Sequence, residues 1–461
     1  MQHTLASYSI EIQVIYPLEM EFTSMSASQL SPPTTTPKPL YHRFSDIFAA
    51  GFSVDWGIGS FLVISHVLVL LLTPVAYIYA PAGLWKVMLT WTLIHAFIGA
   101  LSTTVYSHRL IAHGAAKDVR LPTHIAFLGL QLFAVQGSVR RWSAQHVIHH
   151  SVDKTGQHHL DPYSATWFST SWRNFLWSHM LTYLFNHPYS REFDSALKAK
   201  AHPAIVWQDK HYLPLIIVAN FVLPIGLGIV LAGWLGGFCM LLAGSAGFVL
   251  AQHNTWTVNS VTHMWGFKKG LMSSAQNNYV WLGPLGEGNH HADHHDYPRD
   301  FRNGFGWSGW VLDPTRYAIL ALRALGLVQG LNRASRWQEA QIIARRKVRD
   351  TKAKSGSVIW QQWEDKLAML GDEWFAAAKA WDQFKLEKIK LTHQIRQAGA
   401  DGMAAARGRM GVTQDELMRD LRARREGLRA EMQQARKRLK ARRDEFFTAI
   451  WELKQANMAV A

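Results

Sequence analysis

Three short clusters of histidine are the residues of this sequence whose type and spacing point most directly to chemistry. The chain of 461 residues has 23 histidines, and neutral imidazole is a strong ligand for iron, zinc and copper. The three clusters and one further histidine, which ends the stretch Asn-Ser-Val-Thr-His, comprise His108, His113, His146, His149, His150, His291, His294, His295 and His263. Nine nitrogen ligands exceed what one ion needs, so the sequence predicts two metal ions in one site.

The spacing within each cluster indicates how its side chains converge. Spacings of three and four residues place side chains on the same face of a helix, and the second and third clusters both have the pattern HxxHH. His108 and His113 are five residues apart, so we expect a bend or a helix end between them. Histidines outside the clusters, such as His66 and His393, are predicted to be packing or surface residues.

Four apolar runs are interpreted as the membrane helices that must position these clusters. A helix needs about 20 mostly apolar residues to cross a bilayer, and the runs are residues 58–80, 84–105, 213–235 and 238–250. Pro81-Ala-Gly separates the first pair, and Gly236-Gly237 is expected to break the second, which predicts two helical hairpins. Buried helices of a soluble protein are the alternative, but the near absence of a polar face disfavours them.

Basic residues predict the orientation of the hairpins. Cytoplasmic loops of membrane proteins carry an excess of Lys and Arg, and the segment 109–173 between the hairpins has seven. Both termini and the histidines should then face the cytoplasm, from a bacterial inner membrane or the endoplasmic reticulum. The predicted fold is an all-α, multi-pass integral membrane protein with four transmembrane helices in two hairpins, a cytoplasmic helical dome that carries the histidines, and a basic helical extension.

The C-terminal part of the chain has a different composition. Residues 331–461 hold 28 basic and 17 acidic residues, against 20 and 16 in residues 1–330. The expected domains are an N-terminal tail and linker over 1–50, a membrane-bound domain over 51–331, and a basic helical or coiled-coil extension over 332–461. A solvated helical hairpin ending in one long helix, 414–457, is the simplest interpretation of the extension. Contact with anionic lipid or an acidic electron carrier is the alternative; no nucleic-acid motif is present, so no nucleic acid partner is expected.

The order of the motifs, rather than the histidines alone, resembles a known family. Over about residues 56–331 the sequence is similar to the integral-membrane acyl-CoA desaturases, the stearoyl-CoA desaturase group. The matching stretches are HRLIAH (108–113), RWSAQHVIHH (141–150), HNTWTVNSVTHMWG (253–266) and GEGNHHADHHDYP (286–298). The resemblance implies an oxidoreductase of fatty acid biosynthesis that inserts a cis double bond, expected at the delta-9 position, into a long-chain acyl-CoA.

The resemblance also implies a pair of iron ions as cofactor. Hydrogen on an unactivated methylene is not acidic, so acid–base catalysis cannot remove it, whereas two irons with O2 and two electrons can supply a sufficient oxidant. By the resemblance, the nine histidines named above hold the irons, and Asn259 contributes through a bound water. Membrane lipid would surround the spans.

In this family a kinked tunnel bends the acyl chain beside the metal. The matching positions are Gln136, Trp142, Thr255 and Trp256. Two indoles there would supply rigid walls, locked by hydrogen bonds from the amide and the hydroxyl; from the sequence alone the tryptophans could instead belong to an interfacial belt. Glu287, Asp153 and Asp161 are candidates to orient ligand histidines.

One departure from the family leaves the last cluster open to two registers. Two residues stand between GEG and His291 where the family usually has one, so His290 is the alternative ligand. His291 is preferred because it keeps the HxxHH spacing and the following Tyr297-Pro298.

The source of electrons and the reaction class also have alternatives. No haem-binding His-Pro-Gly-Gly motif occurs, and Cys239, the one cysteine, cannot form an intrachain disulfide or hold a cluster alone. We therefore expect a separate donor, cytochrome b5 or ferredoxin with its reductase. The alternative functions are a related membrane di-iron fatty acid hydroxylase or ketolase, a desaturase of lipid-linked or acyl-carrier-protein-linked chains, and a non-enzymatic metal-binding scaffold.

Overall fold

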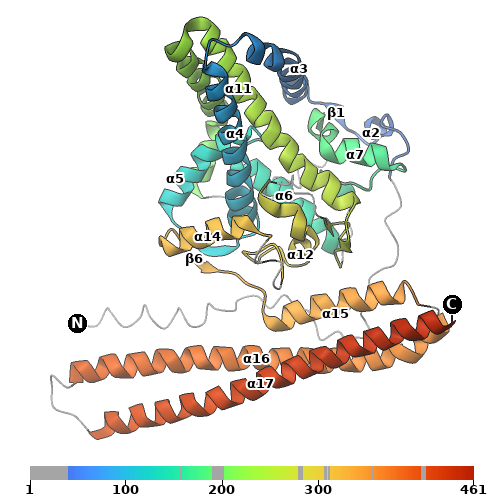
Figure 1. Cartoon of the computed structure of the whole chain (residues 1–461), viewed down its shortest axis with the longest axis vertical. Helices are drawn as coiled ribbons and strands as arrows, with labels where there is room; N and C mark the ends of the chain where they lie inside the picture. Colours follow the sequence, from blue (N-terminus) through green and yellow to red (C-terminus); the bar gives the residue numbers. More distant parts are fainter. Residues whose placement is uncertain are drawn as a thin grey trace. The chain divides into compact units, whose positions relative to one another are not determined.

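The computed structural model describes residues 40–155, 158–188, 202–271, 273–278, 284–305, 309, 312–355, 357–405 and 412–460. This part of the chain forms two compact units, one within Thr35–Ala334 and one within Ser335–Ala461 (Figure 1). The first unit contains the histidine clusters and the apolar runs. The second contains the basic extension.

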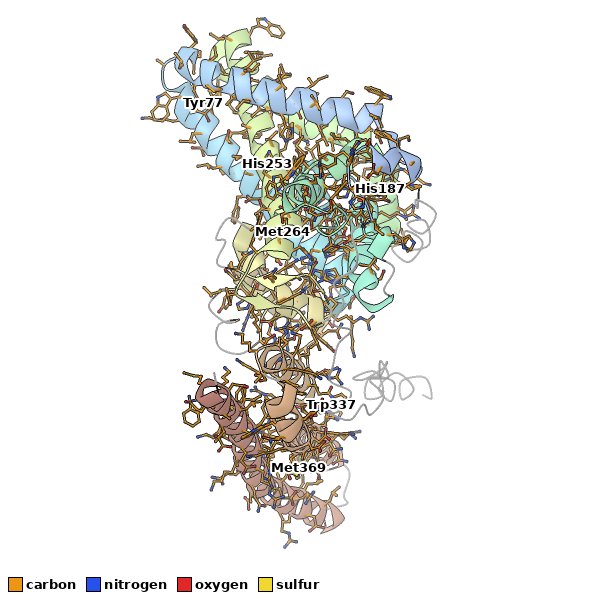
Figure 2. All side chains as sticks on the ribbon, turned by 90° about the vertical axis from the view of Figure 1, so that its right-hand side faces the viewer. Tyr77, His187, His253, Met264, Trp337 and Met369 are labelled. Carbon is orange, nitrogen blue, oxygen red and sulfur yellow. The ribbon has the colours of Figure 1, made fainter. Side chains whose placement is uncertain are left out.

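Long apolar helices dominate the first unit. Among the described residues, three helices are long and apolar enough to cross a membrane: Trp56–Tyr79 (α3), Leu84–Ala112 (α4, Leu84–Ser102, continued by η2, Thr103–Ala112) and Tyr212–Met264. The α3 helix begins where the Asp55 side chain accepts a hydrogen bond from the backbone N–H of Ile58. Apolar side chains on these helices point outward, Ile78 being 75% exposed and Val230 83%. Around Tyr77 the side chains consist almost entirely of carbon (Figure 2), as a lipid-facing surface requires.

The third of these helices folds back on itself. It comprises α10 (Tyr212–Ile217), η6 (Val218–Val222) and α11 (Leu223–Met264). Its 53 residues would span about 80 Å if straight, at about 1.5 Å per residue. The backbone leaves the helical conformation at Ala232 and Gly233, where Gly233 has φ 64°, so the chain reverses there.

Gly236-Gly237 does not form the predicted break. The turn lies at Ala232-Gly233 instead, and a Cβ on Gly228 or Gly236 would overlap the backbone of the other residue. The predicted breaker glycines therefore permit close packing of the two arms of α11 rather than their separation. Both α3 and α4 lie beside α11 (Figure 1). These three helices form the apolar part of the first unit.

Shorter elements complete the first unit. The helices are α2 (Asp46–Ala49), α5 (Leu121–Leu130), η3 (Gln131–Ala134), α6 (Val139–Thr155), η4 (His158–Leu160), α7 (Ser171–His179), η5 (Leu181–Leu184), α9 (Pro203–Lys210), η7 (Pro284–His290), α12 (His291–Asp296) and α14 (Pro314–Ala324). Three antiparallel strand pairs join distant segments: β1 (Ser53–Val54) with β3 (Phe185–Asn186), β2 (Ala116–Val119) with β6 (Val328–Leu331), and β4 (Lys268–Lys269) with β5 (Gln276–Asn277). The described fold is thus helical apart from these short pairs.

The last part of the predicted N-terminal tail belongs to the folded unit. Tyr41 donates a backbone hydrogen bond to the Trp167 carbonyl at 2.9 Å and packs edge-on against its ring. Ile47 is fully buried beside Trp177 in the same apolar cluster. The rest of the predicted tail, including the linker 31–39, lies outside the described residues.

The first compact unit extends to Ala334, three residues beyond the end predicted for the membrane-bound domain. Beyond β6, the backbone N–H of Asn332 donates to the Ala115 carbonyl at 2.8 Å. The N–H of Ala334 donates to the Asp300 carboxylate at 2.8 Å. These bonds fix the segment after β6 to the first unit, so a cut before them removes part of its fold.

We therefore expect a protein that ends at Ala334 to remain monodisperse in detergent with its metal content unchanged. A protein that ends at Gly330 loses part of β6 and both bonds described above, and should give lower yield and a lower melting temperature. Size-exclusion chromatography and thermal melting of the two proteins compare them directly. Equal stability of the two would contradict the boundary at Ala334.

The second unit is a helical hairpin joined by a third helix. It consists of α15 (Arg336–Lys352), α16 (Ser357–Ala405) and α17 (Val412–Val460). Lys366 pairs with Glu452, and Glu387, further along α16, pairs with Arg424, which is earlier on α17. The two helices are therefore antiparallel. The predicted hairpin and its long last helix are confirmed. On α17, Leu428 is 1% exposed but Leu417 is 49% exposed. The main apolar core of this unit lies around Trp360, Trp374 and Phe446.

Candidate metal centre

The first histidine cluster lies on a widened helical turn. Residues Thr103–Ala112 form a π-helix, in which hydrogen bonds join residues five apart, and the N–H of His113 donates to the carbonyl of His108 at 3.1 Å. This turn and the helix end at His113 bring the two ring centroids to 5.0 Å. The expected helix end between the two histidines is confirmed, and the π-turn explains why a spacing of five converges.

The nine predicted histidines gather in two buried groups. Helices η2, α6, α11 and α12 supply them, and every one is at most 8% exposed. Group one contains His108, His113, His146, His150 and His294. Group two contains His149, His263, His291 and His295. The rings of His150 and His295 stack at 3.9 Å, so the two groups adjoin.

The distances between ring nitrogens fit metal ligation. The Nε2 atoms of the pairs His108–His294 and His146–His113 are 2.8 and 3.0 Å apart in group one. In group two, Nε2 of His263 lies 3.2 Å from that of His149 and 2.9 Å from that of His291. Two nitrogens bound about 2.1 Å from one ion at right angles are about 3 Å apart. Each group can therefore hold one ion with little movement.

Burial keeps the imidazoles neutral, as metal ligands must be. Loss of hydration, followed by repulsion from neighbouring histidines, holds the pKa of His146, His150, His294 and His295 well below the usual value. The same causes lower the pKa of His291 to about 3. At neutral pH these rings are therefore uncharged, and one nitrogen of each lies within 4.8 Å of those of the others in its group. Because uncharged imidazole nitrogens do not repel a metal cation, each group is suited to bind one.

Polar side chains lie behind three of the ligand candidates, and two of them are within hydrogen-bond distance. The Nδ1 atom of His149 lies 2.8 Å from the Asp161 carboxylate, and that of His263 lies 2.8 Å from the Ser274 hydroxyl. The Nδ1 atom of His108 is 3.7 Å from the Glu287 carboxylate. Two of the predicted orienting carboxylates are thus beside ligand candidates, whereas the side chain of Asp153 lies outside those described.

His291 and His290 have different surroundings in the last cluster. His291 belongs to group two, whereas His290 is in neither group. The His290 ring instead lies against Gly304, with Nδ1 3.5 Å from the Asp293 carboxylate. The structure therefore favours His291 over His290 as the ligand.

His291→Ala should accordingly lower the metal content and the activity severely, whereas His290→Ala should retain the metal. The two residues are adjacent and both buried, so the comparison holds burial nearly constant. Metal analysis of the two purified variants is the measurement. Loss of metal in His290→Ala alone would reverse the register.

Three of the four predicted substrate-binding residues are joined by hydrogen bonds, and the fourth, Trp256, is buried nearby on α11. Trp142 Nε1 donates to Gln136 Oε1 at 3.3 Å, and Gln136 Nε2 donates to Thr255 Oγ1 at 3.0 Å. Trp256 is 2% exposed and stacks on Tyr183 at 5.2 Å. The Trp142 ring stacks on His146 at 4.9 Å, so this assembly touches group one and is not a surface belt.

Asn259 stands one helical turn before His263 on α11. It is 7% exposed, and its Nδ2 donates to the Tyr183 hydroxyl at 3.2 Å. Its side-chain oxygen is the atom that a ligand water would contact. Its contribution through water stays a prediction.

Two charged residues that sequence reasoning missed lie behind group one. Arg109, inside the first cluster, and Asp313, at the start of α14, are both completely buried and form an ion pair at 2.7 Å. An arginine between two buried histidines requires an acidic partner, and this signal was available in HRLIAH. The sequence does not identify the partner, because Asp313 is about 200 residues away.

Comparison with known proteins places the chain in a family. No protein-family model matches it. The chain is 30% identical over 252 residues to the sn-2 palmitoyl-lipid 9-desaturase of Nostoc sp. (strain 36), covering 53% of this chain and 81% of that protein. The chain belongs to the stearoyl-CoA desaturase-like fatty acid desaturases. It is also 29% identical to the stearoyl-CoA desaturase of Homo sapiens, over 58% of this chain and 72% of that protein.

Membership of the fatty acid desaturase family defines the class of chemistry. The Delta(9)-fatty-acid desaturase fat-6 of Caenorhabditis elegans is another relative, 29% identical over 53% of this chain and 70% of its own length. As a fatty acid desaturase, the protein is an oxidoreductase, and its buried histidine groups could hold metal ions.

Proposed function

We propose that the protein is a di-iron, O2-dependent desaturase that inserts a cis delta-9 double bond into long-chain acyl-CoA. One observation carries the proposal: nine buried histidines converge in two groups whose Nε2 atoms approach to 2.8–3.2 Å. The names of the relatives supply the reaction and its position. The two groups supply a place for one ion each.

The proposed ligands of the first ion are the histidines of group one, and those of the second are the histidines of group two, with Asn259 acting through water. Two irons with O2 and two electrons provide an oxidant able to abstract hydrogen from an unactivated methylene. The protein's contribution is to hold the imidazoles neutral and to orient His149 and His108 through Asp161 and Glu287. Burial of all nine rings also excludes water, which would divert the reaction.

The acyl chain is proposed to bend beside Trp142 and Trp256. Trp142 contacts both the hydrogen-bonded Gln136 and the ligand candidate His146. A chain that follows this indole therefore passes directly from the wall of the tunnel to the metal groups. Because the ring is fixed on both sides, it can select which methylene pair reaches the oxidant.

The membrane topology is proposed to be four spans in two hairpins, with both termini and the metal groups on the cytoplasmic side. The first hairpin turns at Gly83, with φ 80°, and the second at Gly233. Each hairpin returns the chain to the side from which it started. His108 and His263 follow the ends of two spans on that side, and the basic segment 109–173 favours the cytoplasm.

The acyl carrier has two candidates because the relatives differ in it. One relative is named for stearoyl-CoA and another for an sn-2 palmitoyl-lipid. We propose acyl-CoA, with the lipid-linked chain as the alternative. Acyl-carrier-protein-linked substrates and hydroxylation remain outcomes of the test.

Expression in a host that lacks its own desaturase tests the function. Mass spectrometry should detect new cis-delta-9 monounsaturated fatty acids, and labelled acyl-CoA supplied to isolated membranes should be converted before it enters lipid. Conversion only after incorporation into lipid would assign the lipid substrate. A hydroxylated product without an alkene would show that the protein is a hydroxylase and not a desaturase.

A further inference from the structure

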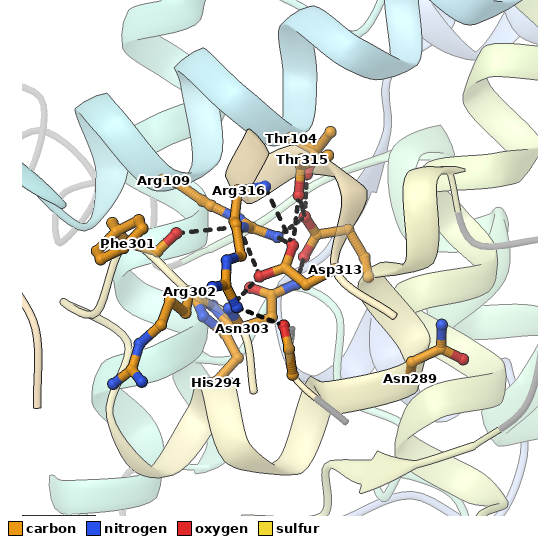
Figure 3. A network of polar contacts seen from close by, with 12 residues as sticks. Thr104, Arg109, Asn289, His294, Phe301, Arg302, Asn303, Asp313, Thr315 and Arg316 are labelled. Carbon is orange, nitrogen blue, oxygen red and sulfur yellow. Dashed lines mark hydrogen bonds and ion pairs between the residues drawn. The ribbon is translucent and has the colours of Figure 1, made fainter. Parts of the chain in front are cut away.

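Behind group one lies a buried network of charges centred on Arg109 (Figure 3). The guanidinium is completely buried and donates through Nη1 to the Phe301 carbonyl and to Asp313 Oδ2, both at 3.1 Å. Through Nη2 it donates to Asp313 Oδ1 at 2.7 Å and to Glu287 Oε1 at 2.8 Å. One side chain of η2 thus joins the segment before the last histidine cluster to the start of α14.

The network fixes the Glu287 carboxylate from several sides. Thr104, Arg109 and Thr315 donate to Oε1, and Asn303 Nδ2 donates to Oε2. The Glu287 side chain is only 4% exposed, and its Oε2 faces His108 Nδ1 at 3.7 Å. The Glu287 carboxylate is therefore fixed in position beside one ligand candidate of group one.

Arg109 also balances the charge in this pocket. Asp313 and Glu287 are both buried and both within 2.8 Å of its Nη2 atom. Without the guanidinium, two buried carboxylates would lie near each other with no cation between them, and one would turn away. With Arg109 present, both carboxylates are held in place by one cation behind His108.

Group two has a separate support. Its His149 contacts Asp161 at 2.8 Å, and Asp161 in turn accepts the backbone N–H of Tyr163 at 3.0 Å. The contacts of the Arg109 guanidinium described above go to Phe301, Asp313 and Glu287, all behind group one. The two groups are therefore oriented by different carboxylates, of which one depends on Arg109.

We infer that Arg109 is a positioning residue that sets the metal affinity of group one alone, by holding the Glu287 carboxylate in place beside His108. The inference rests on the proposed two-metal function. Loss of a group that orients a ligand typically lowers metal affinity about 10- to 100-fold. Removing Arg109 should therefore release the ion of group one and leave that of group two.

The test measures iron per chain and Fe(II) affinity of the full-length protein in detergent. Arg109→Met should retain about one ion and bind the second about 10- to 100-fold more weakly. Arg302→Met is the matched control, because Arg302 is also a buried arginine, 3% exposed and paired with Asp300 at 2.6 Å. It should keep both ions.

Adding a ligand substitution identifies which ion is lost. His294→Ala in the Arg109→Met background should remove no further iron, because His294 belongs to the same group. His149→Ala in that background should remove the remaining ion. The opposite pattern, or two ions bound by Arg109→Met with wild-type affinity, would overturn the inference.

A double variant separates positioning from simple charge balance. Arg109→Met with Asp313→Asn removes one positive and one negative charge, so it should fold even where the single variant does not. If Arg109 positions Glu287, the Fe(II) affinity of group one stays low in the double variant. Wild-type affinity in the double variant would show that Arg109 serves only to neutralise Asp313, and would refute the inference. A wild-type protein that never binds two ions would instead refute the proposed function.

Discussion

His149→Ala and His294→Ala are each expected to abolish desaturation, with product at least about 100-fold below wild type. His149 belongs to group two and His294 to group one, and their Nε2 atoms lie 3.2 Å from His263 and 2.8 Å from His108. Each substitution therefore removes a nitrogen from the centre of its group. The predicted ligands His146 and His295 should behave in the same way. Fatty acid analysis of a desaturase-deficient host expressing each variant is the measurement.

His393→Ala is the matched control and should leave product unchanged, since His393 is exposed on α16 in the other unit. His66 is less suited, because its ring stacks on that of Trp256 at 5.7 Å. Near-wild-type product from His149→Ala would show that the ligand assignment is wrong.

The second large effect is dependence on an external electron donor. With NADPH and acyl-CoA but no added carrier, the purified protein should form no product. Each turnover of the proposed reaction consumes two electrons, and the sequence has a single cysteine and no haem motif to store them. Adding cytochrome b5 or ferredoxin with its reductase should start turnover. Product formation measured with and without the carrier is the comparison.

The salt dependence of the reaction tests how the electron carrier binds. The sequence carries a formal charge of +15, and the proposed carriers are usually acidic. If docking is electrostatic, the apparent affinity for the carrier should fall as ionic strength rises. Turnover in the complete absence of a carrier would contradict the requirement itself.

The histidine site could be predicted because short motifs encode it. The pattern HxxHH places its side chains on one helical face whatever surrounds the helix, so the second and third clusters were identified by spacing. The HxxxxH spacing predicted a helix end but not a π-turn, since the widened turn depends on the tertiary packing of η2. The Nε2 approaches within the groups join residues up to about 190 positions apart, and the order of motifs, not the spacing, indicated them.

What the sequence could not supply was the partner of each buried charge and the exact position of each turn. Arg109 signals a need for a carboxylate, but only the fold brings Asp313 to it. Three glycines within residues 233–237 could all reverse α11, and the choice of Gly233 follows from packing of Gly228 against Gly236. The unit boundary at Ala334 depends in the same way on bonds to Ala115 and Asp300.

Iron analysis of the purified, active protein tests the central claim most directly. Nine buried histidines in two adjoining groups exceed the coordination of one ion and predict about two irons per chain. Chemical iron determination against protein concentration gives the ratio. About two irons per chain, falling together with activity on chelation, is the expected result. About one iron per chain at full activity would contradict the two-metal account.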